Sequence, residues 1–184
     1  LVGSEMCIRD RFMTAHQAAL EALTRYFGYD SFRPGQQGIV EALLAGRDVL
    51  GVMPTGAGKS VCYQIPAALS PGVTLVISPL ISLMRDQVDA LNDLGLPAAF
   101  INTTQTPDEQ AMVFAQAAAG QIKLLYVAPE RLETGRFRDF AARTPISLIA
   151  VDEAHCVSQW GQDFRSSYLG IGDFIAGLPQ RPPV

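Results

Sequence analysis

The chain has 184 residues, of which 48% are hydrophobic and 17% are charged, a composition that suits one globular domain with a sizeable apolar core. Its formal net charge of −4 excludes a general attraction of the whole surface to nucleic acid, so any contact with phosphates has to come from a local patch. The three cysteines form no CxxC pair and indicate neither a disulfide framework nor a zinc site, and no apolar run reaches the ~18 residues of a membrane-spanning helix.

The beginning of the chain differs from the rest. Residues 1–12 show no hydrophobic period and no helix cap, and they make no signal peptide because no apolar segment follows the charges. The string LVGSEMCIRDR resembles translated sequencing-adapter read-through. We therefore expect residues 1–12 to be a non-native leader and Met13 to be the native start.

Two helices are predicted next. Residues 14–27 have Thr14 as a cap and apolar side chains at helical spacing. The segment around Pro34 breaks this helix, and a second helix is predicted over residues 35–46, with Gly46 in the position of a helix-ending glycine.

From residue 48 the chain alternates between predicted strands and helices. The predicted strands are residues 48–53, 73–78, 98–102, 123–128 and 147–153. The predicted helices are residues 58–69, 80–95, 107–120, 129–143 (at least in part) and 168–176. This alternation predicts βαβ units, and hence an α/β fold with a mostly parallel central sheet and helices on both faces.

A glycine-rich loop, MPTGAGKS at residues 53–60, lies between a predicted strand and a predicted helix, which is the context of a phosphate-binding P-loop. Its glycines let backbone N–H groups point at phosphates, while Lys59 would reach the β- and γ-phosphates and the Ser60 hydroxyl would bind Mg²⁺. The residues predicted to contact ATP in this loop are Thr55, Gly56, Ala57, Gly58, Lys59 and Ser60. The alternative is a plain glycine-rich turn with a solvated lysine.

The loop departs from the general pattern G-x-x-x-x-G-K-[ST] at one position. Met53 stands where that pattern has its first glycine. The variant that lacks this glycine is typical of helicase-type ATPases rather than of small kinases or GTPases.

Two adjacent acids end the last predicted strand, where ligands bind in open α/β sheets. Strand alternation points Asp152 and Glu153 in different directions, which suits two roles. Asp152 would hold Mg²⁺ through its water shell, and Glu153 would polarise the attacking water. His155 would hydrogen-bond toward the γ-phosphate or a partner segment. The alternative is an acidic strand end that caps the next helix.

Three segments, FGYDSFRPGQ, MPTGAGKS and VDEAHCVSQWGQDFR, together resemble the RecQ family of superfamily 2 DNA helicases. The resemblance runs from about Tyr26 to the end of the chain, and SPLISLMRDQ, INTTQT and LLYVAPERL also resemble motifs of the family. It implies a RecA-like P-loop NTPase domain over residues 47–184, the first motor domain, truncated at its C-terminus. Residues 13–46 would be N-terminal helices that carry an adenine-recognition motif.

The positions that match the adenine-recognition motif are Tyr29, Arg33 and Gln36. An aromatic ring stacks on adenine, a glutamine amide offers a donor and an acceptor to the edge of the base, and Arg33 would support the base or a phosphate. The alternative is that Tyr29 and Phe32 anchor the core beside a Pro-Gly turn, and for Phe32 we favour that interpretation.

The positions that match the aromatic-rich loop of the family are Trp160, Phe164 and Arg165. This loop is expected to sense single-stranded DNA and couple it to hydrolysis, because bases stack on aromatic faces for ~1–3 kcal/mol each. The alternative is that both aromatic side chains pack against the helix at 168–176. Many relatives carry a histidine where this chain has Gln162, which leaves the strength of the coupling open.

Two further positions match motifs that contact the DNA strand. Ser78 precedes a predicted helix whose first N–H groups would hold a DNA phosphate, and Arg131 would contact a phosphate. The alternatives are a simple strand-to-helix turn at Ser78 and a surface ion pair at Arg131.

The resemblance implies an ATP-dependent DNA helicase that uses ATP and Mg²⁺, moves 3′ to 5′ on single-stranded DNA and unwinds duplex DNA in repair and recombination. It implies a cytoplasmic, nucleoid-associated protein without a membrane partner. The family also has a second RecA-like domain, whose arginine finger is worth ~10³–10⁵ in turnover. The sequence up to Val184 does not contain that domain. We therefore expect this chain alone to hydrolyse ATP poorly and not to unwind DNA.

Two other functions remain as alternatives. One is a nucleotide- or DNA-binding module without turnover, and the other is a DEAH-box RNA helicase. The SQWGQDFR loop and the Tyr-Arg-Gln segment argue against the RNA helicase.

Overall fold

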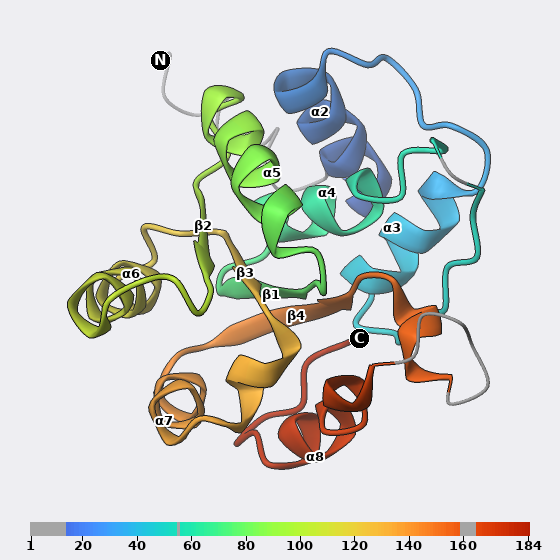
Figure 1. The fold of residues 1–184 in the computed structure, drawn as a ribbon. Coiled ribbons are helices and arrows are strands. Elements are labelled where there is room, and N and C mark those ends of the chain that lie inside the picture. Colours follow the sequence, from blue (N-terminus) through green and yellow to red (C-terminus); the bar gives the residue numbers. More distant parts are fainter. Residues whose placement is uncertain (1–13, 55, 159–164) are drawn as a thin grey trace. The chain divides into compact units, whose positions relative to one another are not determined.

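The computed structural model describes residues 14–54, 56–158 and 165–184. The chain divides into two compact units, residues 1–69 and residues 70–184. Figure 1 shows the elements of both units coloured along the sequence.

The first unit contains three described helices, α2 (Ala15–Phe27), α3 (Gln36–Leu44) and α4 (Val61–Leu69). The predicted cap is confirmed, because the Thr14 side chain accepts from the Gln17 N–H, and the Gln17 side chain accepts from the Thr14 N–H in return. The three helices share one apolar core, whose buried members are Ala19, Ala22, Leu23, Val40 and Ile65. Phe32 packs against this core, as favoured from the sequence.

The strand predicted over residues 48–53 is wrong for this structure. Residues 47–54 have no helix or strand, and the side chains of Leu50 and Val52 are 83% and 89% exposed. An apolar run becomes a strand only when a neighbouring strand accepts its backbone hydrogen bonds. The described sheet contains four other strands and leaves this segment out.

The second unit is built on a four-stranded parallel sheet in the order β2-β3-β1-β4. Its strands are β1 (Val73–Ile77), β2 (Ala98–Ile101), β3 (Leu124–Val127) and β4 (Ile146–Val151). Every residue of β1 and β3 is buried, as expected for central strands of a parallel sheet that is covered on both faces. Four of the five predicted strands are thus confirmed.

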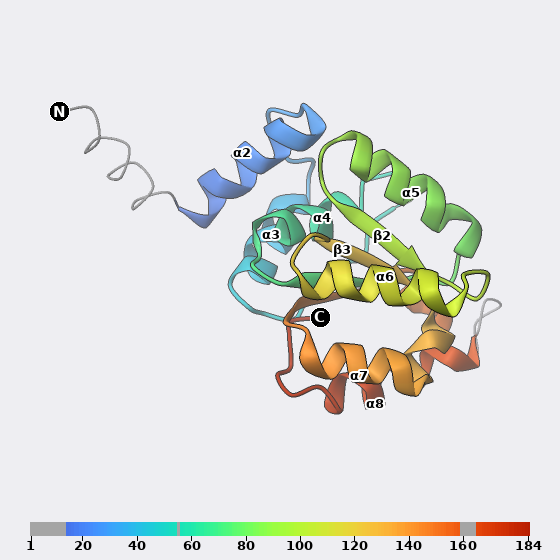
Figure 2. The ribbon, with the colours of Figure 1, turned by 90° about the vertical axis from the view of Figure 1, so that its left-hand side faces the viewer.

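Helices cover both faces of this sheet, which confirms the predicted α/β class. One face packs on α6 (Pro107–Ala118), α7 (Gly135–Arg143) and α8 (Ile171–Ala176) in a single core that contains Leu75, Val127 and Ile149. The rings of Phe114 and Phe140 stack in this core with centroids 4.6 Å apart. Helix α5 (Ile81–Asp93) lies on the other side of the sheet from α7 and α8 (Figures 1 and 2).

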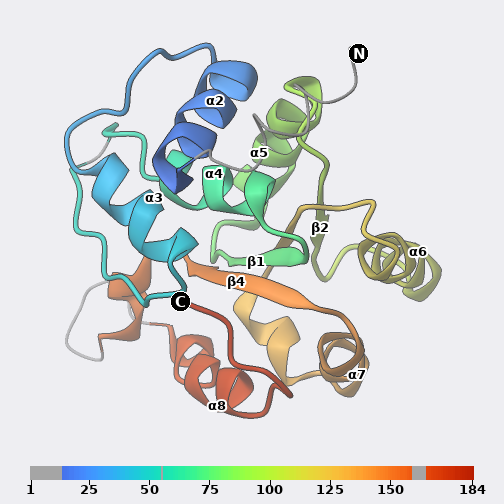
Figure 3. The ribbon, with the colours of Figure 1, turned by 180° about the vertical axis from the view of Figure 1, so that it is seen from behind.

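Short 3₁₀ helices follow two of the strands. They are η1 (Pro129–Glu133) after β3 and η2 (Ala154–Val157) after β4, and a third, η3 (Ser166–Tyr168), precedes α8. The segment after α8 returns to the sheet, where the Pro183 carbonyl accepts from the Ile149 N–H at 3.0 Å, so the C-terminal segment runs beside edge strand β4 (Figure 3). Among the described helices, none combines the length and apolar character that a bilayer crossing requires.

Candidate functional site

The P-loop of the first unit turns at two glycines with positive φ, Gly56 at 79° and Gly58 at 76°. At Gly58 an added Cβ would lie 2.7 Å from Nε2 of Gln36, so both the backbone conformation and the close approach require glycine there. The loop closes on itself, because the Ala57 N–H donates to the Pro54 carbonyl at 3.2 Å. Helix α4 begins at Val61, which leaves Lys59 exposed and Ser60 half-buried in the turn just before it.

Met53, at the start of the loop, contacts α4 through sulfur. Its Sδ lies 3.8 Å from Sγ of Cys62. Burial raises the pKa of the Cys62 thiol to about 11, so this group stays neutral beside the loop. Met53, which departs from the glycine pattern, therefore contacts the helix that follows the loop.

Two of the predicted adenine-recognition residues bond to the P-loop backbone. Nε2 of Gln36 donates to the carbonyls of Ala57 and Gly58 at 3.2 and 3.0 Å, and its Oε1 accepts from the Arg33 N–H at 2.9 Å. The Arg33 guanidinium donates to the Gly56 carbonyl at 3.0 Å. Gln36 is 3% exposed, so its amide is fully engaged inside the protein. The sequence singled out these residues, but it did not predict that they hold the P-loop.

Tyr29, the third predicted adenine contact, has an open ring. Its side chain is 49% exposed, and the Arg33 guanidinium lies over the ring at 5.9 Å from the centroid. Exposed aromatic area of this kind is available for stacking on a base.

In the second unit, the ends of the four parallel strands bring predicted site residues to one edge. The register pairs Ile77 with both Val127 and Val151, and Ile101 with Val127. The residues that follow the strands therefore lie side by side in the order Asn102, Ala128, Ser78, Asp152. This edge is where open α/β sheets bind ligands.

The acid pair lies just beyond β4. The Asp152 N–H still donates to the Ile77 carbonyl at 2.8 Å, and Glu153 adopts φ 50°, the left-handed region. The prediction that strand alternation separates the two side chains is wrong, because the strand ends at Val151 and a turn carries both acids. The Glu153 N–H donates back to Oδ1 of Asp152 at 3.0 Å.

His155 faces Glu153 across this turn. Its Nδ1 lies 3.3 Å from Oε2 of Glu153, and the two side chains are 58% and 31% exposed. When His155 is protonated the contact is an ion pair, and when it is neutral the contact is a hydrogen bond if Nδ1 carries the proton. The structure therefore places Glu153, the predicted water-activating acid, in contact with His155.

Ser78 and Arg131 take part in contacts that shape the sheet edge. Ser78 is 3% exposed, and its Oγ accepts a long hydrogen bond of 3.5 Å from the Leu80 N–H, at the start of α5. The Arg131 guanidinium donates to the Asn102 carbonyl at 3.1 Å. Half-buried Arg131 thus joins η1 to the loop after β2.

The loop after β2 carries the sequence INTTQT, which resembles a motif of the family but named no single site residue. Oδ1 of Asn102 accepts from the N–H and the hydroxyl of Thr104, and Oε1 of Gln105 accepts from the Asn102 N–H. Buried Gln110 donates to the carbonyls of Asn102 and Gln105. Amides and hydroxyls at this spacing are the signal that predicts a self-bonded polar turn.

Arg165 ends the predicted strand-sensing loop. Its N–H donates to the Cys156 carbonyl at 3.0 Å, and its guanidinium makes a long hydrogen bond of 3.5 Å to the Pro79 carbonyl. Arg165 therefore reaches the turn between β1 and α5. Thr55, Trp160, Phe164 and Gln162 lie outside the described residues.

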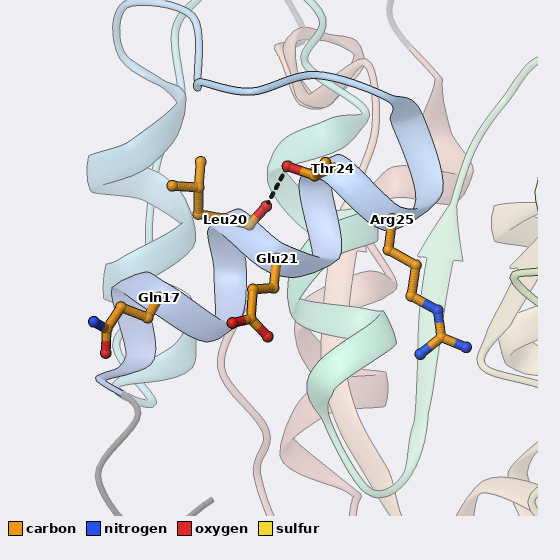
Figure 4. Close-up of a pocket in the computed structure, with 5 residues that line it drawn as sticks. All are labelled: Gln17, Leu20, Glu21, Thr24 and Arg25. Atoms are coloured by element: carbon orange, nitrogen blue, oxygen red, sulfur yellow. Dashed lines mark hydrogen bonds between the residues drawn. The ribbon is translucent and has the colours of Figure 1, made fainter. Parts of the chain in front are cut away.

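An open pocket lies along the outer face of α2 (Figure 4). It is lined by Gln17, Leu20, Glu21, Thr24 and Arg25, and the Thr24 hydroxyl donates to the Leu20 carbonyl at 3.1 Å. All the lining residues belong to one helix, and none belongs to a predicted motif. This pocket is therefore separate from the candidate site.

A parallel sheet with an acid turn at its carboxyl edge, in a chain with a Gly-Lys-Ser loop, is typical of helicase domains of the P-loop class. The chain belongs to the DEAD/DEAH box helicase family, whose sequence profile matches residues 33–181.

Within that family the resemblance to RecQ helicases is confirmed. The chain is 51% identical over 164 residues to the ATP-dependent DNA helicase RecQ of Haemophilus influenzae, covering 89% of this chain and 26% of that protein. It is 46% identical over 167 residues to the RecQ helicase of Bacillus subtilis, covering 90% of this chain and 28% of that protein. The chain thus spans about a quarter of the length of these curated relatives.

Solved structures support the fold. The crystal structure of a hypothetical ATP-dependent RNA helicase from Sulfolobus tokodaii matches with a TM-score of 0.64 at 20% identity, covering 86% of this chain and 46% of that one. The DUF1998 helicase MrfA, bound to DNA and AMPPNP, matches with a TM-score of 0.62 at 20% identity, covering 78% of this chain and 22% of that one. These matches confirm the predicted RecA-like helicase fold.

Proposed function

We propose that this chain is the ATP-binding motor domain of an ATP-dependent DNA helicase, which couples hydrolysis to 3′-to-5′ movement on single-stranded DNA and to unwinding of duplex DNA. The observation that carries the proposal is the acid turn, in which Asp152 and Glu153 are fixed by hydrogen bonds at the carboxyl edge of a parallel sheet. A relative named as an ATP-dependent DNA helicase RecQ, at 51% identity, supports the choice of DNA as the partner. A location at the nucleoid is part of the proposal.

In this proposal the P-loop binds the phosphates of ATP. Lys59 is exposed at the end of the loop and supplies a positive charge to the β- and γ-phosphates. The positive φ values of Gly56 and Gly58 let N–H groups of the loop turn toward the same anion once nucleotide binds. Tyr29 stacks on adenine with its exposed ring, while Arg33 and Gln36 link the base site to the loop backbone.

By their chemistry, Ser60 and Asp152 could each supply a ligand to a magnesium ion. The Ser60 hydroxyl and the Asp152 carboxylate are hard oxygen donors of the kind that Mg²⁺ takes in small number beside water and phosphate. When bound, the ion neutralises charge on the phosphates. Asp152 would hold it through the water shell of the ion, which Mg²⁺ gives up reluctantly.

Glu153 would activate water. An ionised carboxylate accepts a hydrogen bond from the attacking water and receives its proton, and His155 contacts that carboxylate with its Nδ1 3.3 Å from Oε2. Arg165 and the aromatic residues Trp160 and Phe164 would bind single-stranded DNA by phosphate pairing and base stacking. Ser78 and Arg131 would contribute to binding of the same DNA strand, because their hydrogen bonds shape the carboxyl edge of the sheet.

Efficient turnover would need the second RecA-like domain of the complete protein. An arginine finger from such a domain is worth ~10³–10⁵ in rate. We infer that the chain alone binds nucleotide weakly, hydrolyses it poorly and does not unwind DNA.

The test is the ATPase activity of the longest reading frame that contains this chain, with single-stranded DNA, with RNA and with neither. We expect stimulation by DNA that a Lys59→Ala variant abolishes. Substrates with a 3′ or a 5′ overhang then report polarity, and unwinding is expected from the 3′ overhang. Normal turnover in Lys59→Ala would refute the ATP site, and preferential stimulation by RNA would refute the choice of DNA.

A further inference from the structure

Tyr168 is a buried residue whose hydroxyl bonds to the acid turn. The side chain is 3% exposed, and its O–H donates to the Asp152 carbonyl at 2.8 Å, across 16 positions of sequence. Its ring lies in the same core as Cys156 and Phe174. A buried hydroxyl on a rigid aromatic ring is a fixed donor, because the ring cannot move without disturbing the packing around it.

The bond acts on one particular peptide group. The Asp152 carbonyl and the Glu153 N–H belong to the same planar unit. The carbonyl accepts from Tyr168, and the N–H donates to Oδ1 of Asp152 at 3.0 Å. Both polar groups of this peptide are therefore held, which fixes its rotation between the two acids.

That rotation matters because Glu153 has an unusual backbone conformation. Its φ is 50°, and among the described residues it is the one non-glycine residue with positive φ. Such a conformation is strained for a residue with a Cβ and persists only where the surroundings hold it. On one side of this peptide the Asp152 N–H donates to the Ile77 carbonyl in β1, and on the other the Cys156 N–H donates to the Glu153 carbonyl at 2.9 Å. The Tyr168 hydroxyl holds the peptide that lies between these two backbone bonds.

Tyr168 also bonds to Arg165, the last residue of the loop that is predicted to sense single-stranded DNA. Its own N–H donates to the Arg165 carbonyl at 3.0 Å, while the Arg165 N–H donates to the Cys156 carbonyl at 3.0 Å. Tyr168 thus bonds to Arg165 through its backbone N–H and to the Asp152–Glu153 peptide through its hydroxyl.

We propose that Tyr168 is a positioning residue for hydrolysis, whose hydroxyl holds the Asp152–Glu153 peptide in the rotation that water activation by Glu153 requires. This inference rests on the proposed function. Tyr168 itself does not touch the nucleotide, and it acts through the backbone of the acids.

The test compares Tyr168→Phe with Tyr126→Phe in the longest reading frame that contains the chain. Both changes remove one hydroxyl from a buried tyrosine, and Tyr126 is fully buried in β3. Since a neutral hydrogen bond is worth roughly 1 kcal/mol, we expect kcat of Tyr168→Phe to fall about fivefold with the KM for ATP changed by less than about twofold. Tyr126→Phe is expected to keep both constants.

Hydrogen exchange gives a second readout that does not depend on activity. In Tyr168→Phe the amides of Glu153 and Cys156 should exchange faster, while those of β1 and β3 stay protected. Unchanged exchange at Glu153, or a kcat equal to that of Tyr126→Phe, would overturn the proposal.

The two readouts separate this inference from the proposed function. If the wild-type protein shows no turnover that depends on Lys59, the proposed ATPase fails. The exchange experiment still decides in that case whether Tyr168 holds the acid turn.

Discussion

The P-loop and the acid turn are held in different ways. The acid turn continues a buried parallel strand, and its backbone bonds run to the Ile77 carbonyl and to the buried Tyr168 hydroxyl. The P-loop follows a segment without strand structure, and side chains of Arg33 and Gln36 hold its carbonyls. The acid turn, proposed to activate water, is thus fixed by the sheet, whereas the P-loop, proposed to bind nucleotide, depends on side-chain contacts that a ligand can exchange.

The difference suggests that the acid turn needs a fixed geometry, whereas the P-loop needs to change its hydrogen bonds. Residues that activate water need fixed geometry before the reaction, which a strand end supplies. A loop that must wrap around phosphates has to exchange its internal bonds for bonds to the ligand. In the P-loop, the Ala57 N–H and the carbonyls of Gly56 and Gly58 are the groups that would be exchanged or re-aimed.

The largest expected effect is at Glu153 in the acid turn. Glu153→Gln keeps the size of the side chain but removes the proton acceptor, so we expect DNA-stimulated turnover to fall about 10²–10⁴-fold. Binding of a fluorescent ATP analogue should be retained, because the P-loop is intact. The control is Glu21→Gln, an exposed residue of α2. Equal loss of binding and turnover in Glu153→Gln would show that Glu153 holds the nucleotide instead.

The next effect concerns the P-loop backbone. Gly58→Ala combines a φ of 76° with a Cβ that would lie 2.7 Å from Nε2 of Gln36, whereas Gly46→Ala has a φ of 74° and no atom within 4 Å. We expect denaturant unfolding to show a cost of about 1–2 kcal/mol for Gly46→Ala and a larger cost for Gly58→Ala, with nucleotide binding lost only in the latter. Equal costs in both variants would mean that Gln36 does not pack on Gly58.

A smaller effect is expected at Gln36 itself. Gln36→Ala leaves the Ala57 and Gly58 carbonyls without their donor, which should cost about 1–3 kcal/mol and speed hydrogen exchange around residues 56–58. Its neighbour Gln37 donates to the Glu41 carboxylate at 2.9 Å on the exposed side of α3, so Gln37→Ala should have little effect on the loop. Faster exchange at the P-loop in Gln37→Ala alone would reverse this assignment.

The smallest effect is expected in the segment before the P-loop. Since Leu50 is 83% exposed, Leu50→Ser should change the free energy of unfolding by less than about 0.5 kcal/mol. Leu75→Ala, in the fully buried β1, should cost about 2–5 kcal/mol. A core-like cost at Leu50 would restore the strand that the sequence pattern predicts over residues 48–53.

The sequence predicts elements well where local and tertiary preferences agree. The Thr14 cap, the glycine end at Gly46 and the β-branched run of β1 are all found as expected. It fails at residues 48–53, because an apolar run does not say whether a neighbouring strand is present to accept its hydrogen bonds.

The site residues show the same limit. Motif spacing predicts roles for Lys59, Asp152 and Glu153, because the proposed chemistry requires those residue types. The left-handed conformation of Glu153 and the bond from Tyr168 depend on a contact across 16 positions, which no local pattern marks. Gln36 was found by motif, but its bonds to the P-loop follow from the packing of α3 and α4 in one core.

The central claim is that Lys59 and the acid pair act on one nucleotide. A crystal structure of the complete protein with a non-hydrolysable ATP analogue and Mg²⁺ tests it most directly. The account predicts Lys59 Nζ in contact with the β- and γ-phosphates, the Asp152 carboxylate on the water shell of the metal, and Glu153 facing the γ-phosphate through a water. A nucleotide held by the P-loop with Asp152 and Glu153 pointing to bulk solvent would contradict it.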